Sequence, residues 1–310
     1  MPAEWAPHER CVVAWPGLHQ VPDRKLAEAR DAHAEVARKL SEFEAVLMLV
    51  YPGFGRQAEA AAGSTVDVLE VALGTVWMRD TGPIFAVRGG AEVVAVDFRF
   101  NSWGRTLPPY ENSIGGRLCP RLGIERVSVP YVLEGGAFTV DGEGTLVAIE
   151  ASILSDDRNP DSSRGELEGA FRRFLGVERT VWLEHGLLDD RTGGHADNVV
   201  AFAGPGRILC QVVPDDDPNA KRLAANRARL EEAGLEVVPF DVPPSPIRYL
   251  NFYLGNGCVL LPVAGNLNDR RAIDILREVF PDREVVGVPG LPLAAGGGGV
   301  HCITQQIPRP

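Results

Sequence analysis

The feature that most constrains the fold is a repeat of short strands and helices along the chain. Short strands rich in valine and isoleucine begin near residues 66, 127, 180, 236 and 285, at intervals of roughly 50 to 60 residues. After each comes a polar or glycine-rich turn, then two further strands or a hairpin, then a helix. A period of this length is typical of a radial or stacked array of supersecondary units. The sequence therefore predicts an α/β fold built from five similar units.

Helical and strand patterns alternate without a break that would mark a domain boundary. Amphipathic spacing predicts helices at residues 23–44, 163–175, 218–233 and 269–280. Apolar runs predict strands at residues 46–50, 66–71, 84–87, 93–97, 127–129, 138–140, 146–149, 180–183, 199–202, 208–212, 236–239, 258–263 and 285–288. No linker exceeds a few Pro or Gly residues, so we expect one domain over residues 1–310. A doubly wound sheet is the alternative, and the paired strands between helices count against it.

The overall composition argues against several classes of protein. Hydrophobic residues make up 45% of the 310 residues and charged residues 24%, the balance of a folded globular chain. No run of about 18 apolar residues occurs, so no membrane span is expected. The first residues lack a basic segment followed by an apolar core, so no signal peptide is expected. The net charge of −11 argues against a nucleic-acid partner.

The five cysteines are widely spaced, and no two form a Cys-x-x-Cys pair. This spacing argues against a disulfide framework and against a thiolate zinc knuckle, and a reducing cytoplasmic location is the simple interpretation. Cys11, Cys210 and Cys258 lie in apolar stretches and are expected to be inert buried thiols. Cys119 is expected in a loop. Cys302 differs because it follows four consecutive glycines and a Val-His pair.

Four turns of the repeat carry polar residues that turn chemistry alone does not explain. Asp80 lies in one turn, Glu134 in the next, His195 and Asp197 in the third, and Cys302 in the last. If the units surround a common axis, corresponding turns converge and these five side chains meet. A cysteine with a histidine and carboxylates is a constellation used for nucleophilic catalysis by a thiolate.

Each of these residues alone also has an ordinary explanation. An aspartate before Thr-Gly-Pro, such as Asp80, is usually a turn former. A His-x-Asp sequence is more often a local hydrogen-bonded pair than a site. The glycine run 296–299 is more informative, because glycines let another segment or a ligand approach the backbone closely. It is followed neither by the Lys-Ser/Thr of a phosphate loop nor by the distant acid of a dinucleotide fingerprint.

Several motifs, taken together and in order, resemble the agmatine deiminase and bacterial-type peptidylarginine deiminase family. They are Pro2-Ala3-Glu4-Trp5 with His8-Glu9, Trp77-x-Arg79-Asp80-x-Gly82-Pro83, Leu133-Glu134-Gly135-Gly136, Arg158-Asn159-Pro160, Gly194-His195-x-Asp197-Asn198, Asn251-Phe252-Tyr253 and the segment 296–306 around His301-Cys302. The resemblance implies the fold of the guanidino-group-modifying pentein superfamily, an α/β-propeller of five ββαβ units around a pseudo-fivefold axis. It agrees with the repeat found from the strand pattern.

The resemblance also implies a reaction and a role for each residue. Asp80 and Asp197 would bind the guanidinium group of a small-molecule substrate, and Cys302 would attack its carbon as a thiolate. His195 would protonate the departing ammonia and then activate water, while Glu134 would orient His195. The products would be ammonia and a ureido compound, formed through a covalent amidino-thioether. No metal or organic cofactor is required, and a homodimer is the assembly to test.

Two segments depart from the agmatine-specific pattern of that family. Gly74 and Thr75 stand where an acid often precedes the Trp-x-Arg-Asp motif, and Arg191 stands where a glutamate often lies four residues before the histidine. An arginine would repel the distal amine of agmatine and could pair with a carboxylate, so the substrate tail is predicted to be neutral or acidic. Solvent exposure of Arg191 is the alternative. Trp77 is expected to line the pocket or to belong to the core.

Several functions are compatible with the sequence. The chain could act on agmatine, arginine, peptidyl-arginine or a guanidino-acid, or it could transfer the amidino group to an amine. A metallohydrolase using His195, Asp197 and His301 would instead need a metal and would tolerate loss of Cys302. A guanidinium-binding protein without catalysis is a third class, and the presence of the thiol argues against it.

Overall fold

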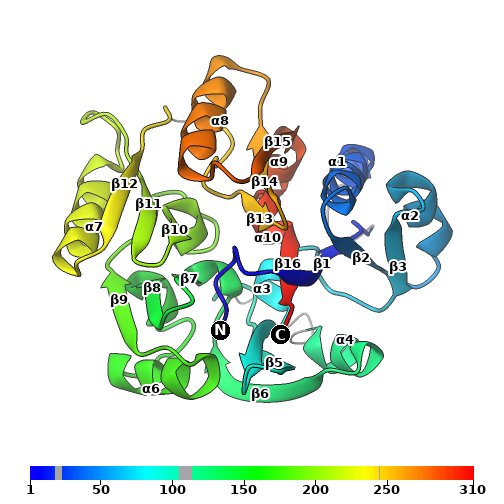
Figure 1. Ribbon diagram of the computed structural model, residues 1–310, viewed down its shortest axis with the longest axis horizontal. Helices are drawn as coiled ribbons and strands as arrows, with labels where there is room; N and C mark the ends of the chain where they lie inside the picture. The colour runs from blue at the N-terminus through cyan, green and yellow to red at the C-terminus, as the bar shows by residue number, and fades with distance from the viewer. Residues whose placement is uncertain (18–22, 105–113, 244) are drawn as a thin grey trace.

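The computed structural model describes residues 1–310 except 18–22, 105–113 and 244. Within these residues the strands form five separate small sheets, one of four strands and four of three. Figure 1 shows the sheets arranged around a common centre, with the longer helices on the outside. None of the helices in the described part of the chain is long and apolar enough to cross a membrane.

Each three-stranded sheet has the same connectivity. Two strands form an antiparallel hairpin, a helix follows, and the last strand returns parallel to the second strand of the hairpin. The first of these units contains β4 (Ile84–Arg88), β5 (Glu92–Arg99), α4 (Gly115–Leu122) and β6 (Glu125–Val132), and the second contains β7 (Phe138–Val140), β8 (Thr145–Ile149), α6 (Arg164–Leu175) and β9 (Arg179–Leu183). The third contains β10 (Val200–Gly204), β11 (Arg207–Gln211), α7 (Ala220–Glu232) and β12 (Glu236–Phe240). The fourth contains β13 (Tyr253–Gly255), β14 (Cys258–Val263), α8 (Leu267–Val279) and β15 (Glu284–Pro289).

The fifth sheet joins the two ends of the described chain. Its order is β16-β1-β2-β3, and β1 pairs with β16 antiparallel and with β2 parallel. The elements are β1 (His8–Ala14), α1 (Asp23–Ser41), β2 (Ala45–Val50), α2 (Gly55–Ala62), β3 (Val66–Glu70) and β16 (Thr304–Pro308). In the other four sheets the first two strands form a hairpin. In the fifth sheet β16, from the far end of the sequence, takes the place of the first hairpin strand and pairs with β1.

The strand pattern predicted the number of units correctly but placed their boundaries wrongly. The strands expected to open the units, near residues 66, 127, 180, 236 and 285, are the last strands of their sheets, β3, β6, β9, β12 and β15. The turn after each therefore leads from one sheet into the next. The polar residues predicted in these turns therefore lie in connections between sheets and not within one sheet.

The four predicted helices are present as α1, α6, α7 and α8, and local sequence explains where two of them begin. Ser163 and Asn266 are N-caps with complete capping boxes for α6 and α8, respectively. The expectation that Cys119 lies in a loop is wrong, because Cys119 is buried inside α4. The sequence did not predict α2, α4 or the strands β1, β13 and β16. Strand β16 is Thr-Gln-Gln-Ile-Pro; its first three residues are polar, and all five are nevertheless buried.

Short helical turns occupy the middle of the molecule and position the site. They are α3 (Met78–Thr81), the 3-10 turns η1 (Gly135–Ala137) and η2 (Ala196–Asn198), and α10 (Val300–Ile303), with α5 (Glu150–Ile153) and α9 (Leu291–Gly296) elsewhere. Helix α3 contacts both α10 and η1, and η1 contacts η2. In Figure 1 α3 and α10 lie near the centre of the ring of sheets.

Candidate active site

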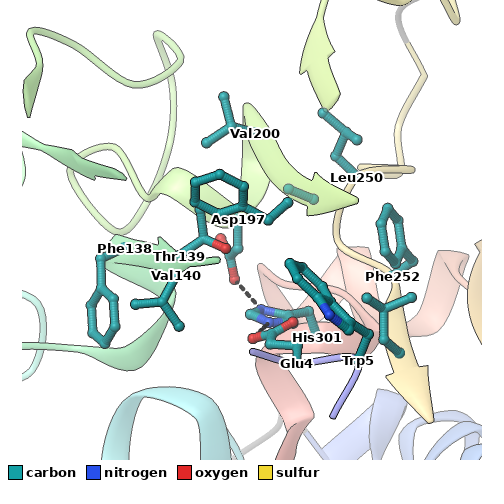
Figure 2. Close-up of a pocket in the computed structure, with 13 residues that line it drawn as sticks. Glu4, Trp5, Phe138, Thr139, Val140, Asp197, Val200, Leu250, Phe252 and His301 are labelled. Atoms are coloured by element: carbon teal, nitrogen blue, oxygen red, sulfur yellow. Dashed lines mark hydrogen bonds and ion pairs between the residues drawn. The ribbon is translucent and has the colours of Figure 1, made fainter. Parts of the chain in front are cut away.

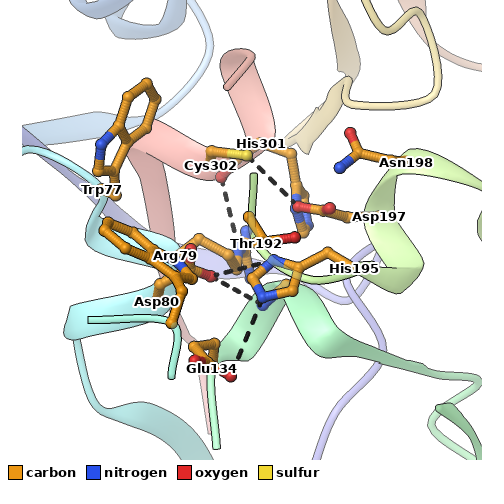
Figure 3. A network of polar contacts seen from close by, with 12 residues as sticks. Trp77, Arg79, Asp80, Glu134, Thr192, His195, Asp197, Asn198, His301 and Cys302 are labelled. Atoms are coloured by element: carbon orange, nitrogen blue, oxygen red, sulfur yellow. Dashed lines mark hydrogen bonds and ion pairs between the residues drawn. The ribbon is translucent and has the colours of Figure 1, made fainter. Parts of the chain in front are cut away.

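The five side chains predicted to converge do so at the centre of the molecule. Asp80 lies in α3, Glu134 directly precedes η1, His195 directly precedes η2, Asp197 lies within η2, and Cys302 lies in α10. Each is at most 5% exposed. Figure 3 shows them facing one another from different segments of the chain. Residues more than 200 positions apart in the sequence therefore belong to one buried polar cluster.

Cys302 is a buried thiol with a carboxylate beside it. Its Sγ donates a weak hydrogen bond to Oδ2 of Asp197 over 3.6 Å, and its backbone N–H donates to Oδ1 of Asn251 over 3.2 Å. Burial, reinforced by the charges of Asp197 and Asp80, raises the pKa of the Cys302 thiol well above its ordinary value. The resting side chain is therefore a neutral thiol, and additional positive charge beside it would favour the thiolate.

His195 sits between two carboxylates without a hydrogen bond to either. Its Nδ1 lies 3.7 Å from Oδ1 of Asp80, and its Nε2 lies 3.9 Å from Oε2 of Glu134. Burial on its own would lower the pKa of His195, but Asp80, Asp197 and Glu134 outweigh it and raise the pKa above its ordinary value. The geometry thus favours an imidazolium that holds a transferable proton inside the site.

Asp80 is held by two hydrogen-bond donors and has a carboxyl group with a raised pKa. The indole Nε1 of Trp103 donates to its Oδ2 over 2.8 Å, and the backbone N–H of Gly136 donates to its Oδ1 over 3.1 Å. Burial raises the pKa of Asp80 to about 6, with His195 opposing the shift and Asp197 and Glu134 adding to it. A cation brought into the site would favour its charged form.

Glu134 is fixed by an arginine whose role the sequence did not indicate. Arg158 Nε lies 2.9 and 3.0 Å from the two carboxylate oxygens of Glu134, and its Nη2 donates to the carbonyl of Thr192 over 2.5 Å. Both side chains are buried. The Arg158-Asn159-Pro160 motif was the available signal, but a single sequence does not say which acid, 24 positions away, the arginine meets.

Glycines near the reacting groups leave no room for a side chain. A Cβ on Gly136 would lie 2.6 Å from Nδ1 of His195 and 2.9 Å from Oδ2 of Asp197. A Cβ on Gly298 would lie 2.5 Å from the Trp77 ring and 3.1 Å from the Cβ of Cys302. These two positions require glycine because other groups approach the backbone closely, as expected from the glycine-rich motifs.

A cavity of about 80 Å³ opens next to the thiol. Its walls are formed by Trp77, Trp103, Arg191, Thr192 and glycines 296–298, with Asp80 and Cys302 at its inner end. Trp77 also packs against the hydrophobic core, so both expectations for this residue apply. Arg191 lines the cavity and is largely exposed, as its position at the mouth requires.

Trp103 is the pocket residue that the sequence analysis missed. It follows β5 in a segment where two successive non-glycine residues, Ser102 and Trp103, have left-handed φ values of 60° and 59°. Such backbone conformations are costly and tend to occur where function requires them. A lone tryptophan in a loop gave no pattern to read, and only its contact with Asp80 assigns it to the site.

His301 is not arranged as a metal ligand. Its Nδ1 is 2.9 Å from Oδ2 of Asp197, and its Nε2 is 2.8 Å from Oε1 of Glu4, so both ring nitrogens face carboxylates. Among the described residues, no three His, Cys, Asp or Glu side chains are placed to hold a metal ion. The metallohydrolase alternative therefore receives no support from the geometry.

The fold and the site define a class of α/β protein in which small sheets surround a centre with one thiol, one imidazole and three carboxylates. Residues 1–308 match the Porphyromonas-type peptidyl-arginine deiminase family. The chain belongs to this family, and the resemblance predicted from its motifs is confirmed.

Individual relatives agree with this assignment. The chain is 36% identical over 358 residues to an agmatine deiminase of Stutzerimonas stutzeri, covering 100% of this chain and 95% of the relative. The solved agmatine deiminase of Enterococcus faecalis matches with a TM-score of 0.92 at 28% identity, covering 100% of this chain and 95% of that one. DDAH from Pseudomonas aeruginosa matches with a TM-score of 0.57 at 14% identity, covering 97% and 99%, a likeness of fold alone.

Proposed function

We propose that this chain is a hydrolase of the agmatine deiminase type, converting a guanidino compound and water into a ureido compound and ammonia. The observation that carries the proposal is a buried cluster in which the Cys302 thiol contacts Asp197 and the His195 imidazole lies beside Asp80. Asp80 and Cys302 also line the cavity of about 80 Å³. The similarity to named agmatine deiminases supports the same reaction.

Substrate binding would prepare the nucleophile. A guanidinium ion between Asp80 and Asp197 offers N–H groups to both carboxylates, which fix its position and localise its charge. The same positive charge lies beside Cys302 and lowers the pKa of the thiol, which is raised in the empty site. The thiol proton leaves to solvent, so the thiolate forms when substrate is bound. The thiolate then attacks the guanidinium carbon.

His195 would move the protons of both half-reactions. The imidazolium protonates one amino group of the tetrahedral adduct, the C–N bond breaks, and ammonia leaves an amidino-thioether on Cys302. The now neutral imidazole takes a proton from water as the water oxygen attacks the same carbon. Collapse breaks the C–S bond, the hydroxyl proton of the adduct passes to the departing sulfur, and the ureido product leaves the restored thiol. Glu134, held by Arg158, keeps the imidazole in place for both steps.

We propose that the five units form one catalytic domain, a pentein propeller over residues 1–310. The segment after the last strand of each sheet supplies one part of the site: Asp80, Glu134, the His195–Asp197 pair, Asn251 and Cys302. This distribution supports a pseudo-fivefold arrangement, because equivalent turns of all units meet at one centre. The free cysteines fit a reducing cytoplasm, and a homodimer remains a prediction.

We propose further that the tail of the substrate is neutral or acidic. Arg191 lines the substrate cavity, and a neighbouring cavity of about 140 Å³ is lined by Arg191, Arg248 and glycines 297–298. A carboxylate on the tail would find two guanidinium groups there, whereas a distal amine would be repelled by Arg191. Asp189 and Asp190 also line this cavity. The oxygens of Asp190 already accept bonds from Thr192, His195 and Asn198, so the exposed Asp189 is the acid that opposes a carboxylate tail there.

Incubation with agmatine, arginine, a peptidyl-arginine and several guanidino-acids, scoring ureido product and ammonia, tests the reaction. Turnover without an added amine is expected, and Cys302→Ser should reduce it by at least about 10³-fold because the hydroxyl is a far weaker nucleophile. Turnover only with an acceptor amine would indicate an amidinotransferase. Sensitivity to a chelator with a fully active Cys302→Ser variant would contradict the proposal, and no turnover of any compound would favour a binding protein.

The tail is tested by comparing kcat/KM for agmatine and for a guanidino-acid of similar length. Arg191→Glu should shift the ratio toward agmatine by about 10-fold or more, and Arg191→Gln should give an intermediate ratio. A strong preference of the unmutated protein for agmatine would contradict the acidic-tail proposal and leave the deiminase proposal intact.

A further inference from the structure

We propose that Glu4, in the N-terminal segment, is a positioning residue that acts through His301 to keep a positive charge beside Cys302. The inference concerns the thiol itself and stands whether or not the substrate is a guanidino compound. It assigns a function to a residue that precedes the first strand and that does not line the substrate cavity.

A chain of four side chains links the N-terminal segment to the thiol. Glu4 Oε1 is 3.1 Å from Nη1 of Arg79 and 2.8 Å from Nε2 of His301. The other ring nitrogen of His301 is 2.9 Å from Oδ2 of Asp197, the same oxygen that accepts from the Cys302 thiol. Figure 2 shows Glu4 and Asp197 next to the His301 ring. These three residues also line a small cavity of about 10 Å³.

The two contacts of His301 determine its charge. A neutral imidazole carries one N–H, so it can donate to only one of two carboxylates and would set its other lone pair against the second. With both nitrogens within hydrogen-bond distance of carboxylate oxygens, the ring donates twice and is an imidazolium. Burial and Arg79 oppose this charge, but Glu4 and Asp197 outweigh them and raise the pKa of His301 above its ordinary value.

Glu4 is itself held in the charged form that this role needs. Burial opposes its ionisation, but His301 and Arg79 outweigh that effect and lower the pKa of Glu4 to about 2. Arg79 also donates from Nε to the carbonyl of His301 over 3.4 Å, which ties the histidine backbone to α3. The charged groups facing the His301 ring are therefore Glu4, Asp197 and Arg79, from three different segments.

The consequence reaches Cys302 because His301 is its neighbour in α10 and shares Asp197 with it. An imidazolium bound to Asp197 offsets the carboxylate charge that raises the thiol pKa. If Glu4 becomes a neutral amide, the ring loses the partner that requires its second proton and becomes neutral. The nearby positive charge then disappears, and the thiolate becomes harder to form.

The test is the pH dependence of alkylation of Cys302 by iodoacetamide, followed by mass spectrometry of the residue 302 peptide in the intact protein. Glu4→Gln should raise the apparent pKa of alkylation and slow the reaction at fixed pH by about 3- to 10-fold. Simple loss of a negative charge would have the opposite sign and lower the thiol pKa. Glu4→Asp should recover part of the rate, and Glu9→Gln, a matched change at an exposed position of β1, should leave the profile unchanged.

A second measurement reports on the ring itself. The imidazole ¹⁵N shifts of His301 should indicate two N–H groups near neutral pH in the unmutated protein and one in Glu4→Gln. An unchanged or lowered thiol pKa in Glu4→Gln, or a ring that stays doubly protonated, would overturn the proposal even if turnover fell. Alkylation needs no substrate, so a failed deiminase assay does not affect either result.

Discussion

Burial raises the pKa of the Asp80 carboxyl group to about 6. In the role proposed for it, Asp80 must be charged to hold a guanidinium group. Below that pH the acid is neutral, so kcat/KM should fall about tenfold per pH unit as the pH decreases through 6. The bound cation favours the carboxylate, so the corresponding limb of kcat should lie at lower pH. Profiles of both constants check this, and a kcat/KM that is flat from about pH 7 to 5 would contradict it.

Gly136 offers a test of how tightly the reacting groups are placed. Alanine at this position would put a methyl group 2.6 Å from His195 Nδ1, so the imidazole must move. A displacement on the order of 1 Å costs about 10²-fold in rate, and we expect Gly136→Ala to lose at least that in kcat/KM. Gly169→Ala is the matched control, because nothing lies within 4 Å of its added methyl group. Equal activity of the two variants would show that the site has more room than the structure gives it.

At the residue scale, the sequence predicted what is carried by short motifs and missed what depends on distant contacts. Asp80, His195 and Cys302 stand in recognisable local strings, and convergence of their turns followed from the repeat. Trp103 and Arg158 contact Asp80 and Glu134, respectively, and nothing in the sequence next to them encodes these partners. Long-range hydrogen bonds come from the packed fold, which periodicity does not specify.

Among the elements, α1 and β1 are joined by a buried histidine that should make stability depend on pH. His33 on α1 donates from Nδ1 to the carbonyl of Ala14 over 2.8 Å, and burial lowers the pKa of His33 to about 4. The unfolded chain binds a proton at its ordinary pKa of about 6.5, whereas the folded chain does not until about 4.

Stability is therefore expected to fall as the pH decreases from about 6.5 to 4, by about 3 kcal/mol from this group. His33→Gln should be less stable at neutral pH but should lose that part of the pH dependence. Urea unfolding of both proteins at several pH values between these limits measures the difference. Parallel curves for the two proteins would contradict the assignment.

Elements whose caps and amphipathic patterns lie in their own sequence were predicted well. Elements that form only by pairing with distant segments were not. Helices α6 and α8 carry their own caps and amphipathic faces. Strand β16 contains two glutamines that are nonetheless buried, one of which donates to the carbonyl of Pro83. The alternation of apolar and polar residues that marks a half-buried strand is absent there, so only its pairing with β1 makes it a strand.

For the whole molecule, the sheet shared by β1 and β16 is the seam that closes the ring of sheets. Removing residues 304–310 would keep Cys302 in the chain but delete β16. Strand β1 would lose one hydrogen-bonded neighbour and become an exposed edge of its sheet. We expect a fall in Tm of at least about 10 °C, or loss of the folded protein. Removing Arg309 and Pro310 alone costs one bond, from Arg309 N–H to the carbonyl of Pro7, and should change Tm by only a few degrees. Similar melting of both truncations would show that the seam contributes little.

The same seam also affects how the chain folds during its synthesis, because its two strands are made at different times. Strand β1 leaves the ribosome almost a full chain length before β16, and at about 5–20 residues per second the delay is roughly 15–60 s. During this interval one edge of a hydrophobic strand has no partner, the condition under which strands pair with other chains. Cys302, the proposed nucleophile, is translated at the end of the same interval, so a nascent chain would lack this thiol while it is most vulnerable to misassembly.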